Sequence, residues 1–131
     1  MKRYFTKKEI GNYGELLAVR YLRLRGYAVK EQNWFSGKCE LDIVATTLRD
    51  VVFVEVKTRT YEGNSWRNAP PPSLAVNSEK QRHTRAAAQS YLYQHPTHKC
   101  PRMDVIEVYL QKNDTGKRPR LLEIRHIKAA Y

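Results

Sequence analysis

Two acidic side chains and a lysine could do chemistry together in this chain, because two short strand-like segments bring them to one place. The segments are residues 40–45 (ELDIVA) and residues 51–57 (VVFVEVK). Side chains alternate in direction along a strand, so Glu55 and Lys57 share one face of the second segment. If the segments pair as a hairpin, Asp42 lies across from Glu55, with side-chain roots about 5 Å apart. Facing carboxylates repel each other, so this pair predicts a bound cation or a protonated acid.

The register of this hairpin follows from its loop and agrees with its apolar face. A four-residue loop at residues 47–50 sets Thr46 opposite Val51. Every apolar side chain on the other face then finds an apolar partner: Leu41, Ile43 and Ala45 lie opposite Val56, Val54 and Val52. The same register places Glu40 opposite Lys57. A salt bridge between these two is the ordinary alternative to a catalytic role for the lysine.

The overall charge indicates what such a site would act on. The chain has 131 residues, which fits one domain over residues 1–131 with a single core. It has 24 lysines and arginines against 13 aspartates and glutamates, a net charge of +11 at pH 7. This excess favours a polyanionic partner, since each cation that meets a phosphate releases condensed counterions. Nucleic acid is the expected partner, and a merely basic protein is the alternative.

The sequence shows no sign of export or of membrane insertion. The basic N-terminal residues are not followed by the apolar core of a signal peptide, and no apolar stretch is long enough for a membrane-spanning helix. Cys39 and Cys100 form no CxxC pair and are interpreted as packing residues in a reducing compartment. We therefore expect a cytoplasmic protein that does not enter membranes.

A short cluster near the middle of the chain offers possible zinc ligands. His95, His98 and Cys100 lie within six residues. Their spacing matches none of the usual paired patterns, and a fourth ligand would have to come from elsewhere. A histidine-rich loop is therefore the favoured interpretation, and a zinc-dependent interaction protein is the alternative.

The predicted elements give an α/β fold in the order α-β-β-β-α-β-β. A capping box at Thr6 and Glu9 begins the first helix and Gly26 ends it, while Gly11 and Gly14 indicate a close approach by backbone or ligand. The remaining strands and helix are expected at residues 27–34, 40–46, 51–57, 78–94, 103–110 and 121–127. The connection from the third to the fourth strand is long enough for a parallel crossover. We expect a mixed sheet of about five strands with a helix on each face.

A long loop beside the acids is a candidate contact for nucleic acid. Residues 59–76 contain glycine, asparagine and three consecutive prolines, a composition that does not sustain regular structure. Arg59 and Arg67 offer cations and Trp66 offers a stacking surface. A loop with no role is the alternative.

The second predicted helix carries cations where a helix normally disfavours them. Lys80, Arg82 and Arg85 lie in its first turns, at the positive end of the helix dipole. This placement favours a nearby phosphate, and a solvated charged face is the alternative.

Several of these segments, taken in order, carry a resemblance to a known family. They are Gly11-Asn12-Tyr13-Gly14-Glu15, Ala18, Tyr21-Leu22, Gly26-Tyr27, Asn33, residues 40–45, residues 53–59 and Lys80. The chain from Gly11 to about Tyr109 resembles the bacterial YraN-type family, which belongs to the restriction-endonuclease-like, PD-(D/E)xK superfamily and is similar to archaeal Holliday-junction resolvases. By resemblance, Asp42, Glu55 and Lys57 fall on the nuclease signature, and Glu15 falls on the acidic residue of the first helix.

The resemblance implies a restriction-endonuclease-like fold and a metal-dependent endonuclease acting on DNA, branched DNA included, in recombination or repair. Asp42 and Glu55, with the carbonyl of Val56, would hold Mg²⁺ or Mn²⁺ through oxygen ligands. Lys57 would position a water and stabilise developing charge, and Glu15 would orient that water or hold a second ion. A homodimer is expected because junction-cutting enzymes act in pairs. The alternative is a nucleic-acid-binding module that keeps the fold and cleaves nothing.

Overall fold

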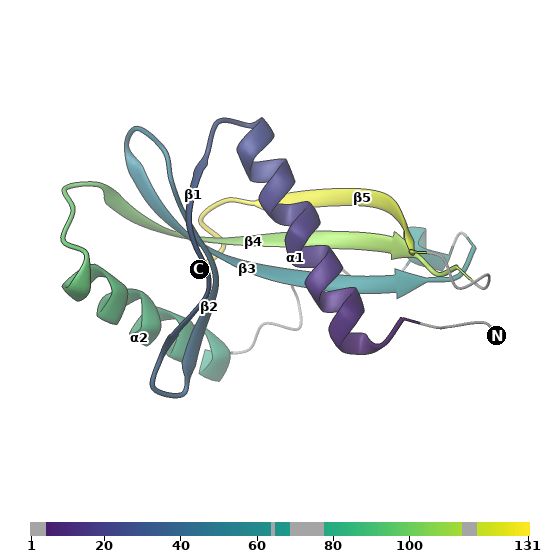
Figure 1. Ribbon diagram of the computed structural model, residues 1–131, viewed down its shortest axis with the longest axis horizontal. Coiled ribbons are helices and arrows are strands. Elements are labelled where there is room, and N and C mark those ends of the chain that lie inside the picture. Colours follow the sequence, from purple (N-terminus) through teal and green to yellow (C-terminus); the bar gives the residue numbers. More distant parts are fainter. Residues whose placement is uncertain (1–4, 64, 69–77, 114–117) are drawn as a thin grey trace.

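A computed structural model describes residues 5–63, 65–68, 78–113 and 118–131 of the chain. Its helices are α1 (Lys7–Leu24), α2 (Ser78–Gln94) and a short 3₁₀ helix, η1 (Ser65–Asn68). Its strands are β1 (Ala28–Ser36), β2 (Cys39–Thr46), β3 (Asp50–Tyr61), β4 (Cys100–Gln111) and β5 (Arg120–Ile127), arranged as in Figure 1. None of the helices within these ranges is both long and apolar enough to cross a membrane. The predicted α/β class and element order are confirmed.

The five strands form one mixed sheet in the order β1-β2-β3-β4-β5. β1, β2 and β3 are successive antiparallel neighbours, and β5 runs antiparallel to β4. β3 and β4 are parallel, and α2 carries the chain between them. Parallel neighbours need such a crossover, so the predicted mixed sheet follows from the length of this connection.

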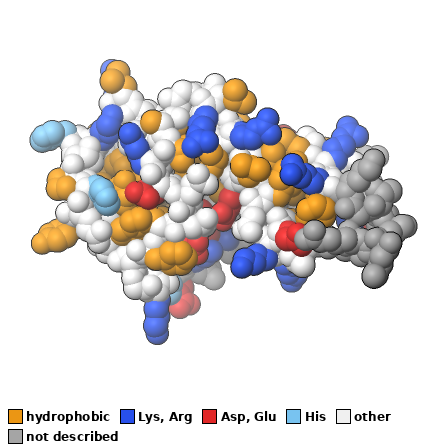
Figure 2. Space-filling model, in the orientation of Figure 1, with side chains coloured by type: hydrophobic (Ala, Val, Ile, Leu, Met, Phe, Trp, Pro, Cys, Tyr) orange, Lys and Arg blue, Asp and Glu red, His pale blue; other side chains and the backbone are white. Residues whose placement is uncertain are grey.

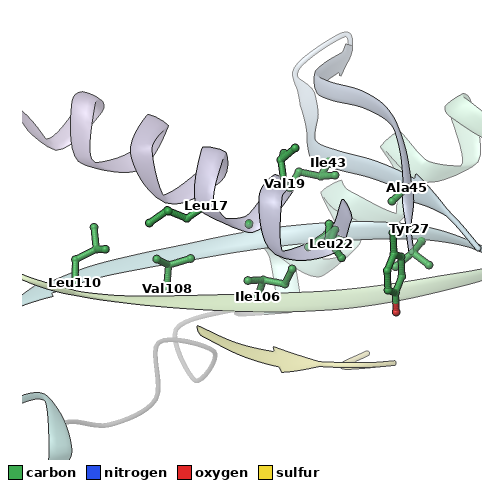
Figure 3. Close-up of a cluster of buried hydrophobic side chains, with 12 residues drawn as sticks. Leu17, Val19, Leu22, Tyr27, Ile43, Ala45, Ile106, Val108 and Leu110 are labelled. Carbon is green, nitrogen blue, oxygen red and sulfur yellow. The ribbon is translucent and has the colours of Figure 1, made fainter. Parts of the chain in front are cut away.

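Each face of the sheet has its own apolar core under one helix. α1 covers the first core, in which Leu17, Val19 and Leu22 meet sheet residues that include Ile43, Ala45, Ile106, Val108 and Leu110 (Figure 3). α2 covers the second, in which Ala87, Ala88 and Tyr91 meet Leu41, Val44, Val51 and Phe53. A fully buried valine, leucine or phenylalanine stabilises the fold by about 1.5–3 kcal/mol. β2 and β3 are therefore held from both sides, and they form a firm base for side chains that project from them.

α1 is fixed at its start by a cap and in its first half by a close approach to β3. The predicted capping box forms: the Glu9 N–H donates to Thr6 Oγ1 at 3.1 Å, and the Thr6 N–H donates to Glu9 Oε1 at 3.2 Å. A Cβ atom at Gly14 would lie 1.9 Å from Oγ1 of Thr58, whereas one at Gly11 would meet nothing within 4 Å. The predicted close approach is present at Gly14, where a side chain and not backbone or ligand makes it, and no atom of the described residues makes one at Gly11.

The β2–β3 hairpin has the predicted register wherever its strands are paired. Thr46 lies opposite Val51 and Ile43 opposite Val54, where the pairing ends. At the next position, Asp42 does not continue the backbone ladder but accepts the Val56 N–H on its side-chain Oδ2, at 2.9 Å. The two strands therefore begin to diverge at Asp42.

Leu41 departs from its predicted face. It packs with Phe53 on the α2 side of the sheet, whereas Ile43 lies on the α1 side. The change of face falls where the β2–β3 ladder ends, and Asn33, level with Asp42 in the neighbouring strand, has a φ of +50°. An irregularity of this kind breaks the alternation of side chains. The predicted pairing of Leu41 with Val56 is therefore wrong.

The structure moves the start of the predicted loop. β3 continues to Tyr61, so Arg59 belongs to a strand, and Trp66 and Arg67 belong to η1. Residues 69–77, which include the three prolines of the predicted loop, lie outside the described residues.

The two cysteines are free thiols in different surroundings. Cys39 is half-buried and packs beside the core under α2. Cys100 is exposed at the start of β4. The interpretation as a packing residue is correct for Cys39 and wrong for Cys100.

A buried ionic network fixes the end of β5 against β4. Asp104 is fully buried, accepts from Arg102 Nη2 at 2.8 Å and from the N–H of Ala129 at 3.0 Å, and lies 2.6 Å from His126 Nε2. Burial alone would raise the pKa of Asp104, but the bonds from His126 and Arg102 lower it to about 2. The residues after β5 are thereby held against the sheet.

Candidate functional site

A pocket of about 370 Å³ opens where the β1–β2 hairpin, the middle of β3 and the start of α2 meet. Figure 1 shows this hairpin and α2 side by side at the lower left of the molecule. Asp42 and Glu55 both line the pocket, and Lys80 joins them from α2. The other described lining residues are Lys38, Cys39, Glu40, Val54, Glu79, His83 and Thr84. The two predicted acids therefore converge on one opening.

Asp42 is held in place by its bond to the Val56 N–H and is surrounded by other acids. Its pKa is raised from 3.8 to about 7: burial and, to a smaller extent, the charges of Glu15, Glu55 and Glu40 raise it, while the bond from Val56 lowers it. Near neutral pH the carboxyl group is therefore about half protonated in the metal-free protein. Because its negative charge is costly here, Asp42 gains from any cation that enters the pocket.

Glu55 is a buried carboxylate held between two lysines. Its side chain is only 4% exposed, and its Oε1 lies 3.1 Å from Nζ of Lys57 and 2.8 Å from Nζ of Lys80. Neither Oε1 nor Oε2 has a hydrogen bond of good geometry within the described residues. A buried oxygen without such a bond costs about 1–3 kcal/mol. Oε2 is thus an acceptor to which no group of the described residues donates.

Lys57 pairs with a different acid from the one that the register suggested. Its recorded ion pair is with Glu55 on its own strand, and the β2–β3 pairing stops before Glu40 could lie opposite it. The side chain of Lys57 is 17% exposed. An ion-pairing role is therefore present in the structure, and a catalytic role stays a prediction.

Glu15 approaches the acids from α1. Burial raises its pKa; a hydrogen bond with Asn33 lowers it, and the charge of Glu40 raises it. Its charge in turn raises the pKa of Asp42, so the two lie within electrostatic range of each other. The contact of Gly14 with β3 sets this placement, because it brings α1 down onto the strand next to Glu15.

The donor set at the pocket fits a hard divalent cation. Mg²⁺ is usually held by one or two carboxylates, with waters and substrate phosphate completing its shell. Asp42, which is crowded by acids, and Glu55, whose Oε2 has no hydrogen-bond donor among the described residues, could supply those two carboxylates. Within residues 5–63, 65–68, 78–113 and 118–131, no group of three or more histidine, cysteine, aspartate or glutamate side chains could hold a metal ion. The zinc alternative at His95, His98 and Cys100 thus has no geometric support.

Of the predicted cations of α2, only Lys80 reaches the pocket. Lys80 lines it, while Arg82 and Arg85 are exposed on the same helix. The guanidinium of Arg85 lies 5.6 Å from the ring centre of Tyr131. Figure 2 shows lysine and arginine side chains spread over the face drawn there, not gathered in one stripe. A positive field of this breadth suits approach by a polyanion from several directions.

The predicted stacking residue lies farther away. Trp66 packs edge-on against Tyr109, with ring centres 6.0 Å apart, and Arg67 lies 5.7 Å over the Trp66 ring. Tyr109 pairs with Arg59, an exposed residue four positions along β3 from Glu55. Four strand residues span roughly 13 Å. The structure therefore does not bring Trp66 and Arg67 into the pocket.

Sequence reasoning missed several residues around the pocket. His83 and Thr84 lie three and four positions after the predicted Lys80, which is the spacing of one helix face, and that spacing was a usable signal. Lys38 comes from the hairpin turn. Tyr131 has its pKa raised by burial and lowered by a bond with Thr84. Nothing in the local sequence marks Tyr131, because the path of the chain after β5 brings it there.

The metal-free protein is expected to lose stability through Asp42 as the pH rises from about 4 to about 8. The folded pKa of about 7 exceeds the ordinary 3.8, so in this window the folded state holds a proton that the unfolded chain has released. Raising the pH therefore favours unfolding, by on the order of 2–4 kcal/mol over the whole window.

Urea unfolding of the wild type and Asp42→Asn at about pH 5 and about pH 8 checks this pH dependence. The wild type should lose more stability than the variant, whose amide does not titrate. An equal loss in both proteins would show that Asp42 is not the titrating group.

The fold and the pocket together define a small mixed α/β protein with an acid-and-lysine site at diverging strands. Comparison with known proteins identifies the family. The profile of "Uncharacterised protein family UPF0102" matches residues 14–108, which include Glu15, Asp42, Glu55, Lys57 and Lys80. The chain belongs to this family.

Relatives from several bacteria support the assignment. A UPF0102 protein of Porphyromonas gingivalis is 42% identical over 108 residues, which cover 82% of this chain and 76% of the relative. One from Caldicellulosiruptor saccharolyticus is 36% identical over 128 residues, which cover 96% of this chain and 99% of the relative. One from Geobacter metallireducens is 40% identical over 125 residues, which cover 95% of this chain and 93% of the relative. The similarity therefore spans almost the whole chain.

Proposed function

We propose that this protein is a Mg²⁺- or Mn²⁺-dependent endonuclease of restriction-endonuclease-like type that hydrolyses phosphodiester bonds in DNA, with branched DNA as its expected substrate in recombination or repair. The observation that supports this is the convergence of Asp42 and Glu55 in one pocket, with Lys57 and Lys80 at Glu55. Such a set supplies oxygen ligands for a hard cation and ammonium groups for a phosphate.

Each residue has a distinct task in this proposal. Asp42 and Glu55, with the carbonyl of Val56, would hold the ion, and a bound ion would supply charge neutralisation at the scissile phosphate and a more acidic water. Lys57 lies beside Glu55 and stabilises the charge that develops on the phosphate. Glu15 orients the attacking water through its position beside the acids.

A DNA-binding module without cleavage is the second candidate, and one observation favours it. Lys57 and Lys80 already place two positive charges against Glu55, so this acid is compensated without a metal ion. In that case both lysines are structural partners of the acid, and exposed cations such as Arg59 and Arg82 carry the binding.

Incubation of the protein with branched, flapped and linear DNA distinguishes the two candidates. We expect cleavage only when Mg²⁺ or Mn²⁺ is present, with branched DNA cut fastest. Asp42→Asn and Lys57→Ala should bind the same DNA and leave it intact. If wild type and variants are equally inert, yet bind with a steep salt dependence, the binding module is the correct function.

The proposed homodimer is tested by sizing the complex of the protein with a four-way DNA junction. A homodimer predicts two copies of the protein per junction.

A further inference from the structure

We infer that Lys80 competes with the metal ion for Glu55. When a phosphodiester binds, Lys80 leaves Glu55 and pairs with the phosphate, so that the pocket binds metal and nucleic acid cooperatively. The inference rests on the proposed function and deepens it. It assigns Lys80 a positioning role at the acid, in addition to contact with phosphate.

The two lysines at Glu55 differ in their freedom to move. Lys57 projects from the middle of a paired strand, and its side chain is 17% exposed. Lys80 lies in the first turn of α2, its side chain is 54% exposed, and its Nζ lies closer to Glu55 Oε1, at 2.8 Å against 3.1 Å. A lysine with a flexible four-carbon stem can change partners within a pocket of this size. Lys80 is therefore the exchangeable partner of Glu55, and Lys57 is the fixed one.

Lys80 opposes the entry of a cation as long as it holds Glu55. Its ammonium group pairs with Oε1 of Glu55, and the neighbouring Oε2 has no hydrogen-bond donor among the described residues. Burial alone would lower the pKa of Lys80, but its contact with Glu55 raises it, so the side chain stays charged. A divalent ion bound at Glu55 would then share one carboxylate with two ammonium groups and be repelled by both. The pocket without nucleic acid should thus bind metal weakly.

A phosphodiester at the pocket mouth changes this balance. Its anionic oxygens offer Lys80 an alternative to Glu55, and Lys80 is exposed enough to reach one. When Lys80 moves to the phosphate, Glu55 is free to bind the ion, and the phosphate contributes a further oxygen ligand. By linkage, nucleic acid must strengthen metal binding by the same factor as metal strengthens nucleic-acid binding. The ion then occupies its site chiefly when a phosphodiester is bound at the pocket.

Titration of Mn²⁺ without DNA, followed by electron paramagnetic resonance of the free ion, tests the inference directly. Lys80→Met keeps most of the aliphatic stem and removes the charge, and it should bind Mn²⁺ about tenfold more tightly than the wild type. Arg82→Met is the matched control: it removes one charge from the same helix, but its exposed side chain does not line the pocket. Its Mn²⁺ affinity should stay within about twofold of the wild type.

The same titration with a short branched duplex whose phosphorothioate linkages resist cleavage, checked on a gel to be intact, gives the second readout. DNA should strengthen Mn²⁺ binding more in the wild type than in Lys80→Met. The inference is overturned if Lys80→Met binds Mn²⁺ no more tightly than the wild type without DNA, or if neither protein binds it. DNA cleavage without a Lys80 effect on Mn²⁺ affinity would overturn this inference alone. Tighter Mn²⁺ binding by Lys80→Met in a protein that never cuts DNA would overturn only the endonuclease proposal.

Discussion

Asp42→Asn is expected to lower the rate of metal-dependent DNA cleavage by on the order of 1000-fold while leaving DNA binding intact. The amide keeps an oxygen that can accept the Val56 N–H, so the local backbone need not move. It removes the negative charge that, with Glu55, would hold the ion. Single-turnover cleavage in Mn²⁺ measures the loss, and fluorescence anisotropy with labelled DNA measures the binding.

Asp50→Asn provides the matched control for this loss of activity. Asp50 pairs with Arg102 at 3.0 Å and does not line the pocket. The same change of acid to amide there should alter the cleavage rate by less than about threefold, because its partner is partly exposed. If Asp42→Asn cuts DNA as fast as Asp50→Asn does, Asp42 holds no catalytic ion, and the endonuclease proposal loses its pair of carboxylates.

Gly14→Ala is expected to destabilise the fold by about 2 kcal/mol, because overpacking of a tight contact typically costs about 1–3 kcal/mol. The added Cβ would lie 1.9 Å from Thr58 Oγ1, 2.8 Å from its Cγ2 and 2.9 Å from its Cβ. Relief requires α1 to move away from β3, since rotating the Thr58 side chain leaves its Cβ in place. Urea unfolding measures the loss. Because Glu15 is the next residue, we also expect the pKa of Asp42 to shift.

Gly11→Ala, one turn earlier on the same helix, separates packing from helix propensity. Nothing lies within 4 Å of the Cβ it would add, so it should stabilise the helix by up to about 1 kcal/mol. The two substitutions are chemically identical and are expected to have opposite signs. If both stabilise the protein, the approach of α1 to β3 is looser than the structure indicates.

The hairpin register was predictable because two independent local signals agreed. Loop length placed Thr46 against Val51, and apolar pairing of Ile43 with Val54 matched that placement, as the structure confirms. The error at Leu41 had a different origin. Strand alternation assumes a regular, continuously paired strand, but the pairing of β2 with β3 stops at Ile43, beside the left-handed Asn33 of β1. No feature of residues 40–45 themselves reports that irregularity.

The candidate site was predictable only in part for a similar reason. Asp42, Glu55 and Lys57 lie on adjacent strand segments, so their neighbourhood follows from short-range periodicity. The ion pair between Lys80 and Glu55 joins residues from separate elements, and the sequence suggested a phosphate partner for Lys80 without placing it on this acid. Trp66 shows the opposite case. Its aromatic ring suited stacking on nucleic acid, yet Trp66 packs against Tyr109 at a distance from the pocket.

By itself, the amino-acid sequence determined the helices, the strands, their order and the parallel crossover, because these depend on periodicity, caps and connection lengths along a single stretch of chain. Tertiary structure alone decided where β2 and β3 part, which face Leu41 takes, and how Glu15 and Lys80 reach the acids from two different helices. Those outcomes depend on which helix packs on which face and how closely, as at Gly14 and Thr58. Burial then sets the charge state: Asp42 has an ordinary carboxylate pKa in an extended chain and one of about 7 only when the fold surrounds it.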